Sequence, residues 1–228
     1  MLENVQTLAL EIGPICNMAK AHPWCPSGHP DRYRAHASSP PASRYDRLRF
    51  IQSCFRAGFH GHLAFHLYNE PMLEYEAVVE LARIAKTITG IPSVIWTNGT
   101  DYDKIDRALF RVVRTDYSGT GGDDATPYEH DDRIEIYRQP LCPRPAPCYR
   151  PAEIELPVDY YGDVHLCCAD WRGTVFVGNI KHDNHEDIIA EFARCAERAK
   201  EGSFDLCCQC QSLERSPMVC NSGFRLWD

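Results

Sequence analysis

The arrangement of the cysteines is the feature that most constrains this sequence. The chain has 12 cysteines in 228 residues, and nine of them follow residue 140. Its first residues lack the basic and apolar regions of a secretory signal, so we expect a cytoplasmic protein, in which disulfides are not maintained. A chain of this length can bury a core without covalent cross-links. The cysteines therefore favour metal ligation, and they favour a disulfide framework only if the protein is exported.

Composition narrows the class of protein further. Hydrophobic residues make up 44% of the chain and charged residues 25%, as in folded soluble domains. No apolar stretch approaches the roughly 20 residues that a membrane-spanning helix needs. The formal net charge of -8 gives no reason to expect a nucleic acid or an anionic membrane surface as a partner.

A proline-rich segment predicts a boundary near residue 140. The sequence LCPRPAPC follows Pro140, and its prolines exclude both a regular helix and a central strand. We therefore predict one domain over residues 1–139 and a smaller one over residues 140–228.

The first part alternates apolar runs with helical patterns, which is typical of βα units around a parallel sheet. The predicted strands are Thr7–Ile12, His62–Leu67, Ser93–Trp96, Phe110–Thr115 and Arg133–Arg138. The predicted helices are Tyr45–Phe59, Glu74–Thr89 and Tyr102–Leu109. Five strands are fewer than the eight of a closed barrel, so the predicted fold class is α/β with a truncated, open (β/α) barrel.

The second part predicts a small α+β unit. Glu153–Val158 and Val164–Cys168 flank the turn DYYGD and predict a β-hairpin. Thr174–Val177 predicts an edge strand, and Glu186–Lys200 an amphipathic helix.

The C-terminal cysteines have the spacing of a metal site. Cys207 and Cys210 form a CxxC, which lets two thiolates from one tight turn reach one metal centre. Cys148 and Cys167 supply two more sulfurs, and Cys142 competes with Cys148. Zinc and an iron–sulfur cluster both accept four thiolates, so the spacing leaves both open. A buried free thiol accounts for Cys195, on the apolar face of the predicted helix.

Three motifs follow predicted strands in the first part. The loop after the first strand contains Cys16, His22, Trp24 and Cys25, the second strand leads into NEP, and the third ends in TNG. In this order the motifs resemble the radical S-adenosylmethionine (radical SAM) superfamily, in which CxxxCxΦC (Φ aromatic) holds a [4Fe-4S] cluster that binds S-adenosylmethionine.

The chain departs from that family pattern at the middle cysteine. Between Cys16 and Cys25 no cysteine is present. Imidazole replaces thiolate on iron in Rieske centres, so we expect His22 as the third ligand, with His29 and Cys54 as alternatives.

The same resemblance implies the residues that bind the cosubstrate. They lie at the ends of the second, third and fourth predicted strands: Tyr68, Asn69, Glu70, Pro71, Thr97, Asn98, Arg114 and Thr115.

The second part resembles the twitch or SPASM domains of radical SAM enzymes. Gly162 and Cys167 match their Gx4C element, and a GNI at Gly178–Ile180, a helix and the CxxC follow. The resemblance implies one auxiliary [4Fe-4S] cluster on Cys148, Cys167, Cys207 and Cys210.

The resemblance implies a radical oxidation. A 5′-deoxyadenosyl radical would abstract hydrogen from a small substrate such as a sugar, aminocyclitol or nucleoside. The auxiliary cluster would accept an electron, and a flavodoxin or ferredoxin would supply the reducing electron. Tyr68, Tyr117 and Tyr137 are candidates to line the pocket, and Glu135 or Asp116 to accept the proton. The alternatives are sulfur insertion, peptide modification and a non-enzymatic zinc-binding interaction module.

Overall fold

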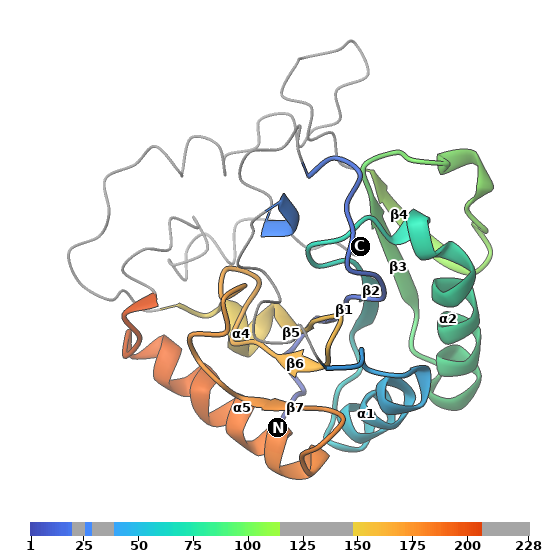
Figure 1. The fold of residues 1–228 in the computed structure, drawn as a ribbon. Coiled ribbons are helices and arrows are strands. Elements are labelled where there is room, and N and C mark those ends of the chain that lie inside the picture. Colours follow the sequence, from blue (N-terminus) through green and yellow to red (C-terminus); the bar gives the residue numbers. More distant parts are fainter. Residues whose placement is uncertain (20–25, 29–38, 115–147, 207–228) are drawn as a thin grey trace.

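The computed structural model describes residues 1–19, 26–28, 39–114 and 148–206, which Figure 1 draws in colour. The strands are β1 (Thr7–Leu10), β2 (His62–Phe65), β3 (Ser93–Thr97), β4 (Phe110–Arg114), β5 (Glu155–Val158), β6 (Asp163–Val164) and β7 (Gly178–Asn179). The α-helices are α1 (Arg44–Arg56), α2 (Tyr75–Thr89), α4 (Arg150–Glu153) and α5 (His185–Lys200). Short 3-10 helices cover Pro26–Gly28, Pro71–Glu74 and Tyr102–Lys104.

The strands form one sheet with β1 near its centre. The order is β4-β3-β2-β1-β5-β6-β7. The first five are parallel, and β6 and β7 are antiparallel to their neighbours. Leu8 on β1 lies opposite Leu63 on β2 and Leu156 on β5. Within the described residues the sheet ends at β4 and β7, so it is open, as predicted for a truncated barrel.

The helices cover the outside of this sheet. Figure 1 shows α2, α1 and α5 following one another around it, with α1 in contact with both of the others. None of the described helices combines the length and apolar character that crossing a lipid bilayer requires.

Local sequence signals set the helix ends. Ser43 caps α1 through a reciprocal capping box with Asp46. Gly90 ends α2 in the left-handed conformation at φ 72°. Asn184 caps α5 by accepting from two backbone N–H groups of the first turn.

Two groups of buried side chains hold the layers together. The larger one joins the sheet to α1, α2 and α5 and includes Phe50, Phe65 and Phe192. A smaller one packs Leu166, next to Cys167, against Cys195, Ala199 and Phe204. The cysteine-bearing segment after β6 is thus anchored to α5 by apolar contact.

Three local predictions were wrong in detail. Tyr102–Leu109 is not an α-helix: only Tyr102–Lys104 is helical, as a 3-10 turn. The edge strand is Gly178–Asn179 rather than Thr174–Val177, because the Asp170 carboxylate binds the N–H groups of Thr174 and Val175 and holds them in a turn. The second hairpin strand ends at Val164, before the segment bends around Asp170.

The hairpin continues the main sheet. β5 pairs with β1 along its whole length, so the predicted second domain shares its sheet with the first. The predicted strand Arg133–Arg138 and the predicted boundary segment, except for its last residue Cys148, lie outside the described residues.

Candidate functional site

The carboxyl ends of the parallel strands gather polar side chains at one edge of the sheet. This edge is where ligands bind in open α/β sheets. Glu11 follows β1, Glu70 follows β2, Thr97 ends β3 and Asp159 follows β5. All four are buried.

The carboxylate of Glu70 joins the ends of β2 and β3. One oxygen accepts from the Thr97 hydroxyl at 2.8 Å and from the Met72 N–H at 3.0 Å, and the other accepts from the Asn98 N–H at 2.8 Å. Burial raises the pKa of the Glu70 carboxyl above its usual value, although these three bonds lower it. Both oxygens accept hydrogen bonds from the protein, and only 2% of the residue is exposed. The side chain therefore holds the ends of β2 and β3 together, and we call this set of contacts the frame of the sheet edge.

The loop after β1 is tied to the same frame. Asn98 donates from its side chain to Asn17 at 2.8 Å, and Asn17 donates to the Thr100 hydroxyl at 2.8 Å. The Glu70 N–H donates to the Ile15 carbonyl at 3.0 Å. The structure therefore brings together the three strand-end motifs around Cys16, Glu70 and Asn98, and it bonds Asn17 to Thr100, which are 83 residues apart in sequence.

Asn69 presents a buried amide at this edge. Both its side-chain nitrogen and its oxygen are shielded from solvent and have no hydrogen-bond partner among the described residues. Leaving a buried polar group unpaired costs about 1–3 kcal/mol. Such a group in a native structure calls for an explanation, and a bound ligand would pair it.

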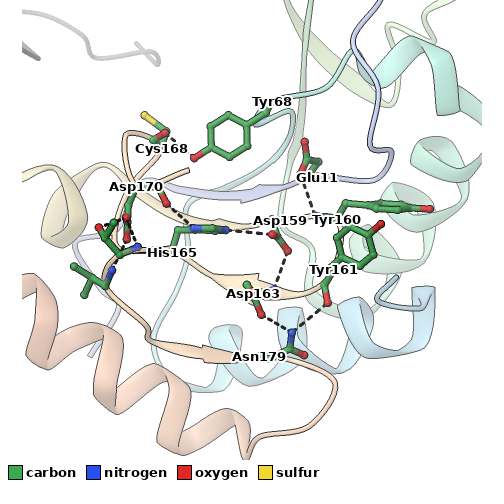
Figure 2. A network of polar contacts seen from close by, with 12 residues as sticks. Glu11, Tyr68, Asp159, Tyr160, Tyr161, Asp163, His165, Cys168, Asp170 and Asn179 are labelled. Carbon is green, nitrogen blue, oxygen red and sulfur yellow. Dashed lines mark hydrogen bonds and ion pairs between the residues drawn. The ribbon is translucent and has the colours of Figure 1, made fainter. Parts of the chain in front are cut away.

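A second set of polar contacts surrounds the cysteine-bearing segment, as Figure 2 shows. The His165 ring lies between Asp170 and Asp159: Nδ1 is 2.8 Å from the Asp170 carbonyl, and Nε2 is 3.3 Å from an Asp159 carboxylate oxygen. Burial is the largest single influence and lowers the pKa of His165, but Asp159 and Asp170 together outweigh it and raise the pKa above its usual value. Acceptors on both sides of the ring favour the imidazolium form.

Cys167 and Cys168 lie beside this histidine. The Cys167 carbonyl accepts from the Asp170 N–H at 3.0 Å. The Cys168 N–H donates to Glu155 at 2.8 Å, and the Cys168 carbonyl accepts from the Tyr68 hydroxyl at 2.6 Å. Burial raises the pKa of Tyr68 well above its usual value, so the phenol keeps its proton and donates.

A buried arginine secures the adjoining strand ends. Arg47 on α1 donates to the carbonyls of Glu11 at 3.0 Å and of Tyr160 at 2.9 Å, and also to Ala42. The Glu11 carboxylate in turn accepts from the Tyr160 N–H at 3.0 Å. The ends of β1 and β5 are thus held together through one cation and one carboxylate.

The described cysteines fall into two environments. Cys148 and Cys167 are buried thiols, and the N–H of Cys148 donates to the Ala199 carbonyl of α5 at 2.8 Å. Cys54 lies in the hydrophobic core, where burial strongly raises the pKa of its thiol. Cys195 is a buried thiol as predicted, and burial raises its pKa to about 11.

Several predicted site residues lie outside the described residues. They are His22, Cys25, His29, Thr115, Asp116, Tyr117, Glu135, Tyr137, Cys142, Cys207 and Cys210. In the described parts of the chain no three His, Cys, Asp or Glu side chains converge as metal ligands. Arg114 is described by its backbone, at the end of β4.

Six buried polar residues that support this edge were not predicted from the sequence. They are Glu11, Arg47, Glu155, Asp159, His165 and Asp170. Glu11 and Asp159 directly follow apolar runs, and that position was a usable signal. Arg47 had none, because its partners are brought to it by the fold.

Comparison with known proteins agrees with this arrangement. Residues 148–212 match the SPASM family, an iron-sulfur cluster-binding domain. The fold is similar to a crystal structure of BtrN in complex with AdoMet and 2-DOIA, with 18% identity, a TM-score of 0.65, and 95% of this chain and 99% of that chain covered. A selenomethionine BtrN structure in an open conformation has 18% identity, a TM-score of 0.64, and coverage of 93% and 94%. No curated protein matches the sequence. These findings confirm the predicted resemblance: the chain shares the fold of BtrN, and residues 148–212 match the SPASM iron–sulfur domain.

Proposed function

We propose that this protein is a radical SAM enzyme that oxidises a small molecule with the help of an auxiliary iron–sulfur cluster. The observation that carries the proposal is the meeting of three motifs at one sheet edge. The loop of Cys16 is bonded to the TNG turn through Asn17 and Asn98, and Glu70 bonds the NEP turn to the same place. A buried carboxylate that joins two strand ends in this way fixes the positions of the backbone groups that would contact a ligand.

The donors near this edge suit an N-terminal [4Fe-4S] cluster and S-adenosylmethionine. Cys16, with His22 and Cys25, would hold three irons of the cluster, and residues 68–71, 97, 98, 114 and 115 would hold the cosubstrate. When bound, this pair supplies a 5′-deoxyadenosyl radical. The unpaired amide of Asn69 fits this role, because it can both donate to and accept from a polar cosubstrate.

Glu70 would act by positioning. Both its oxygens accept hydrogen bonds from the protein, so it would hold Asn69 and the neighbouring backbone in place for the cosubstrate. Its burial at the foot of the turn also keeps water from the strand ends, which protects a reactive species.

Buried thiols support the auxiliary cluster. Cys148 and Cys167 would supply two of its four thiolates, and Cys207 and Cys210 of the CxxC the other two. When bound, such a cluster supplies an acceptor for one electron from the substrate. The SPASM match over residues 148–212, which includes all four cysteines, supports this assignment.

A compact substrate is favoured by similarity. BtrN, whose fold this chain shares, has been solved with AdoMet and 2-DOIA. We therefore propose a sugar, aminocyclitol or nucleoside as substrate, with Glu135 or Asp116 accepting the proton lost on oxidation and Tyr137 lining the pocket. The electron donor would be a flavodoxin or ferredoxin, and the protein would be cytoplasmic.

Two measurements on anaerobically prepared protein test the proposal. Metal analysis should find about eight irons and eight labile sulfides per chain, as two [4Fe-4S] clusters require. Zinc without labile sulfide would instead favour the interaction module. A panel of deuterated aminocyclitols, sugars and nucleosides should then give one substrate whose deuterium appears in 5′-deoxyadenosine together with a product two electrons more oxidised. Transfer of sulfur to the product would overturn the oxidation.

A further inference from the structure

Three hydrogen bonds hold the two peptide groups that follow Cys167. The Cys167 carbonyl accepts from the Asp170 N–H at 3.0 Å, and the Cys168 N–H donates to the Glu155 carboxylate at 2.8 Å. The next carbonyl, that of Cys168, accepts from the Tyr68 hydroxyl at 2.6 Å. Figure 2 shows the Tyr68 hydroxyl directed at Cys168.

Two of the three groups that form these hydrogen bonds come from β5 and from the turn after β2. Glu155 begins β5, which pairs with β1 at the centre of the sheet, and Tyr68 lies in the turn after β2. Both side chains are buried, with exposures of 4% and 6%. The segment after β6 has no strand or helix of its own between residues 165 and 177. Its position near Cys167 therefore depends on side chains from elsewhere in the fold.

We infer that Glu155 and Tyr68 are positioning residues for Cys167, which they hold through the backbone of Cys168. The inference rests on the proposed function in that Cys167 is taken as an auxiliary-cluster ligand. Groups that orient metal ligands from outside the coordination sphere commonly change metal affinity by about 10- to 100-fold when they are lost.

Tyr68 links the two proposed cofactor sites. It directly precedes Asn69 and Glu70, which belong to the proposed cosubstrate site, while its hydroxyl binds the neighbour of Cys167. The buried Tyr68 side chain thus connects, by one hydrogen bond, the turn after β2 to the segment that carries the proposed auxiliary ligand.

Conservative variants of the full chain test this assignment. Tyr68→Phe removes one oxygen atom, and Glu155→Ala removes the acceptor of the Cys168 N–H. Glu155→Gln keeps an oxygen that can accept that bond and should restore most of the wild-type behaviour. Tyr160→Phe and Glu153→Ala are matched controls, since no hydrogen bond to the Cys167–Cys168 segment comes from either side chain among the described residues.

Hydrogen exchange and iron release are the two readouts. We expect Tyr68→Phe and Glu155→Ala to speed deuterium uptake in residues 165–170 several-fold, while uptake in α5 stays unchanged. We also expect roughly tenfold faster loss of auxiliary-cluster iron to a chelator. If Glu155→Ala also speeds deuterium uptake in α5, this substitution has unfolded the domain. The positioning role is then judged from Tyr68→Phe alone.

The failure of this inference can be told from the failure of the proposed function. The proposed function would be overturned if wild-type protein contained neither iron nor labile sulfide. The hydrogen-exchange comparison would still test whether Glu155 and Tyr68 position the backbone at Cys168. The inference would be overturned if Tyr68→Phe and Glu155→Ala both took up deuterium in residues 165–170 no faster than the two control variants. That result would count whatever the metal content.

Discussion

The Glu70 carboxylate accepts a 2.8 Å hydrogen bond from the hydroxyl of Thr97, and this contact joins the ends of two parallel strands inside the protein. The two residues are 27 positions apart, and each belongs to a motif that the sequence places directly after a strand. Their contact brings those motifs into one frame with Asn98 and Asn17. The proposed cosubstrate site depends on this frame.

Replacing Glu70 with glutamine should destabilise the protein. The carboxylate accepts from Thr97, Met72 and Asn98, whereas an amide offers one oxygen, so at least one buried donor loses its partner. We expect a loss of about 1–3 kcal/mol in the free energy of unfolding, measured with urea. Glu76→Gln on the exposed face of α2 is the control and should change it by less than about 0.5 kcal/mol. Equal stability of the two variants would show that the Glu70 contacts contribute little.

The same pair of proteins gives a prediction for pH. Burial raises the pKa of folded Glu70 above its ordinary value of 4.5. Between these two pKa values the folded state binds more protons than the unfolded state, so ionisation of Glu70 lowers stability as the pH rises. The stability difference between wild type and Glu70→Gln should therefore be largest below pH 4.5 and should shrink as the pH rises through the folded pKa. A difference that grows with pH would mean that the three hydrogen bonds outweigh burial.

Asn69→Ala should separate binding from stability. In the part of the chain that the structure describes, the wild-type amide is buried without a partner, so its removal should leave the free energy of unfolding unchanged or raise it by about 1 kcal/mol. Binding of S-adenosylmethionine, followed by calorimetry, should weaken about tenfold, because a hydrogen-bonding group at the site is lost. Unchanged affinity together with lower stability would assign Asn69 a purely structural role.

A pair of substitutions compares Cys148, a proposed auxiliary-cluster ligand, with Cys54, which lies in the hydrophobic core. Cys148→Ala should remove about four irons per chain, since one cluster loses a thiolate. Cys54→Ala should retain full iron content and lose about 1–2 kcal/mol of stability, because it only shortens a side chain in the core. Loss of iron in Cys54→Ala would favour Cys54 over His22 as the third ligand of the N-terminal cluster.

Much of the architecture was predictable because its signals are local. Buried parallel strands appear as short apolar runs, and four such runs in the first part correspond to β1, β2, β3 and β4. Gly90 and Asn184 mark helix ends whose geometry needs only neighbouring residues. The strand-end motifs were recognised for the same reason, since each follows its strand directly.

The remaining features depend on contacts between distant segments. No property of residues 155–158 alone indicates that β5 pairs with β1. Arg47 is a buried cation because carbonyls of Glu11 and Tyr160, 36 and 113 residues away, converge on it. His165 and Glu155 have partners from separate turns and strands. In the sequence, such residues cannot be distinguished from charged residues on the surface, because their burial depends on the tertiary fold.

The formation of 5′-deoxyadenosine is the most direct test of the proposed function. Iron-loaded protein should be reduced with dithionite under anaerobic conditions, given S-adenosylmethionine, and sampled over time by chromatography. Wild-type protein should form 5′-deoxyadenosine steadily, and Cys16→Ala should form none while it keeps the iron of the auxiliary cluster. Iron-loaded wild-type protein that forms no 5′-deoxyadenosine above the protein-free background would contradict a radical SAM activity.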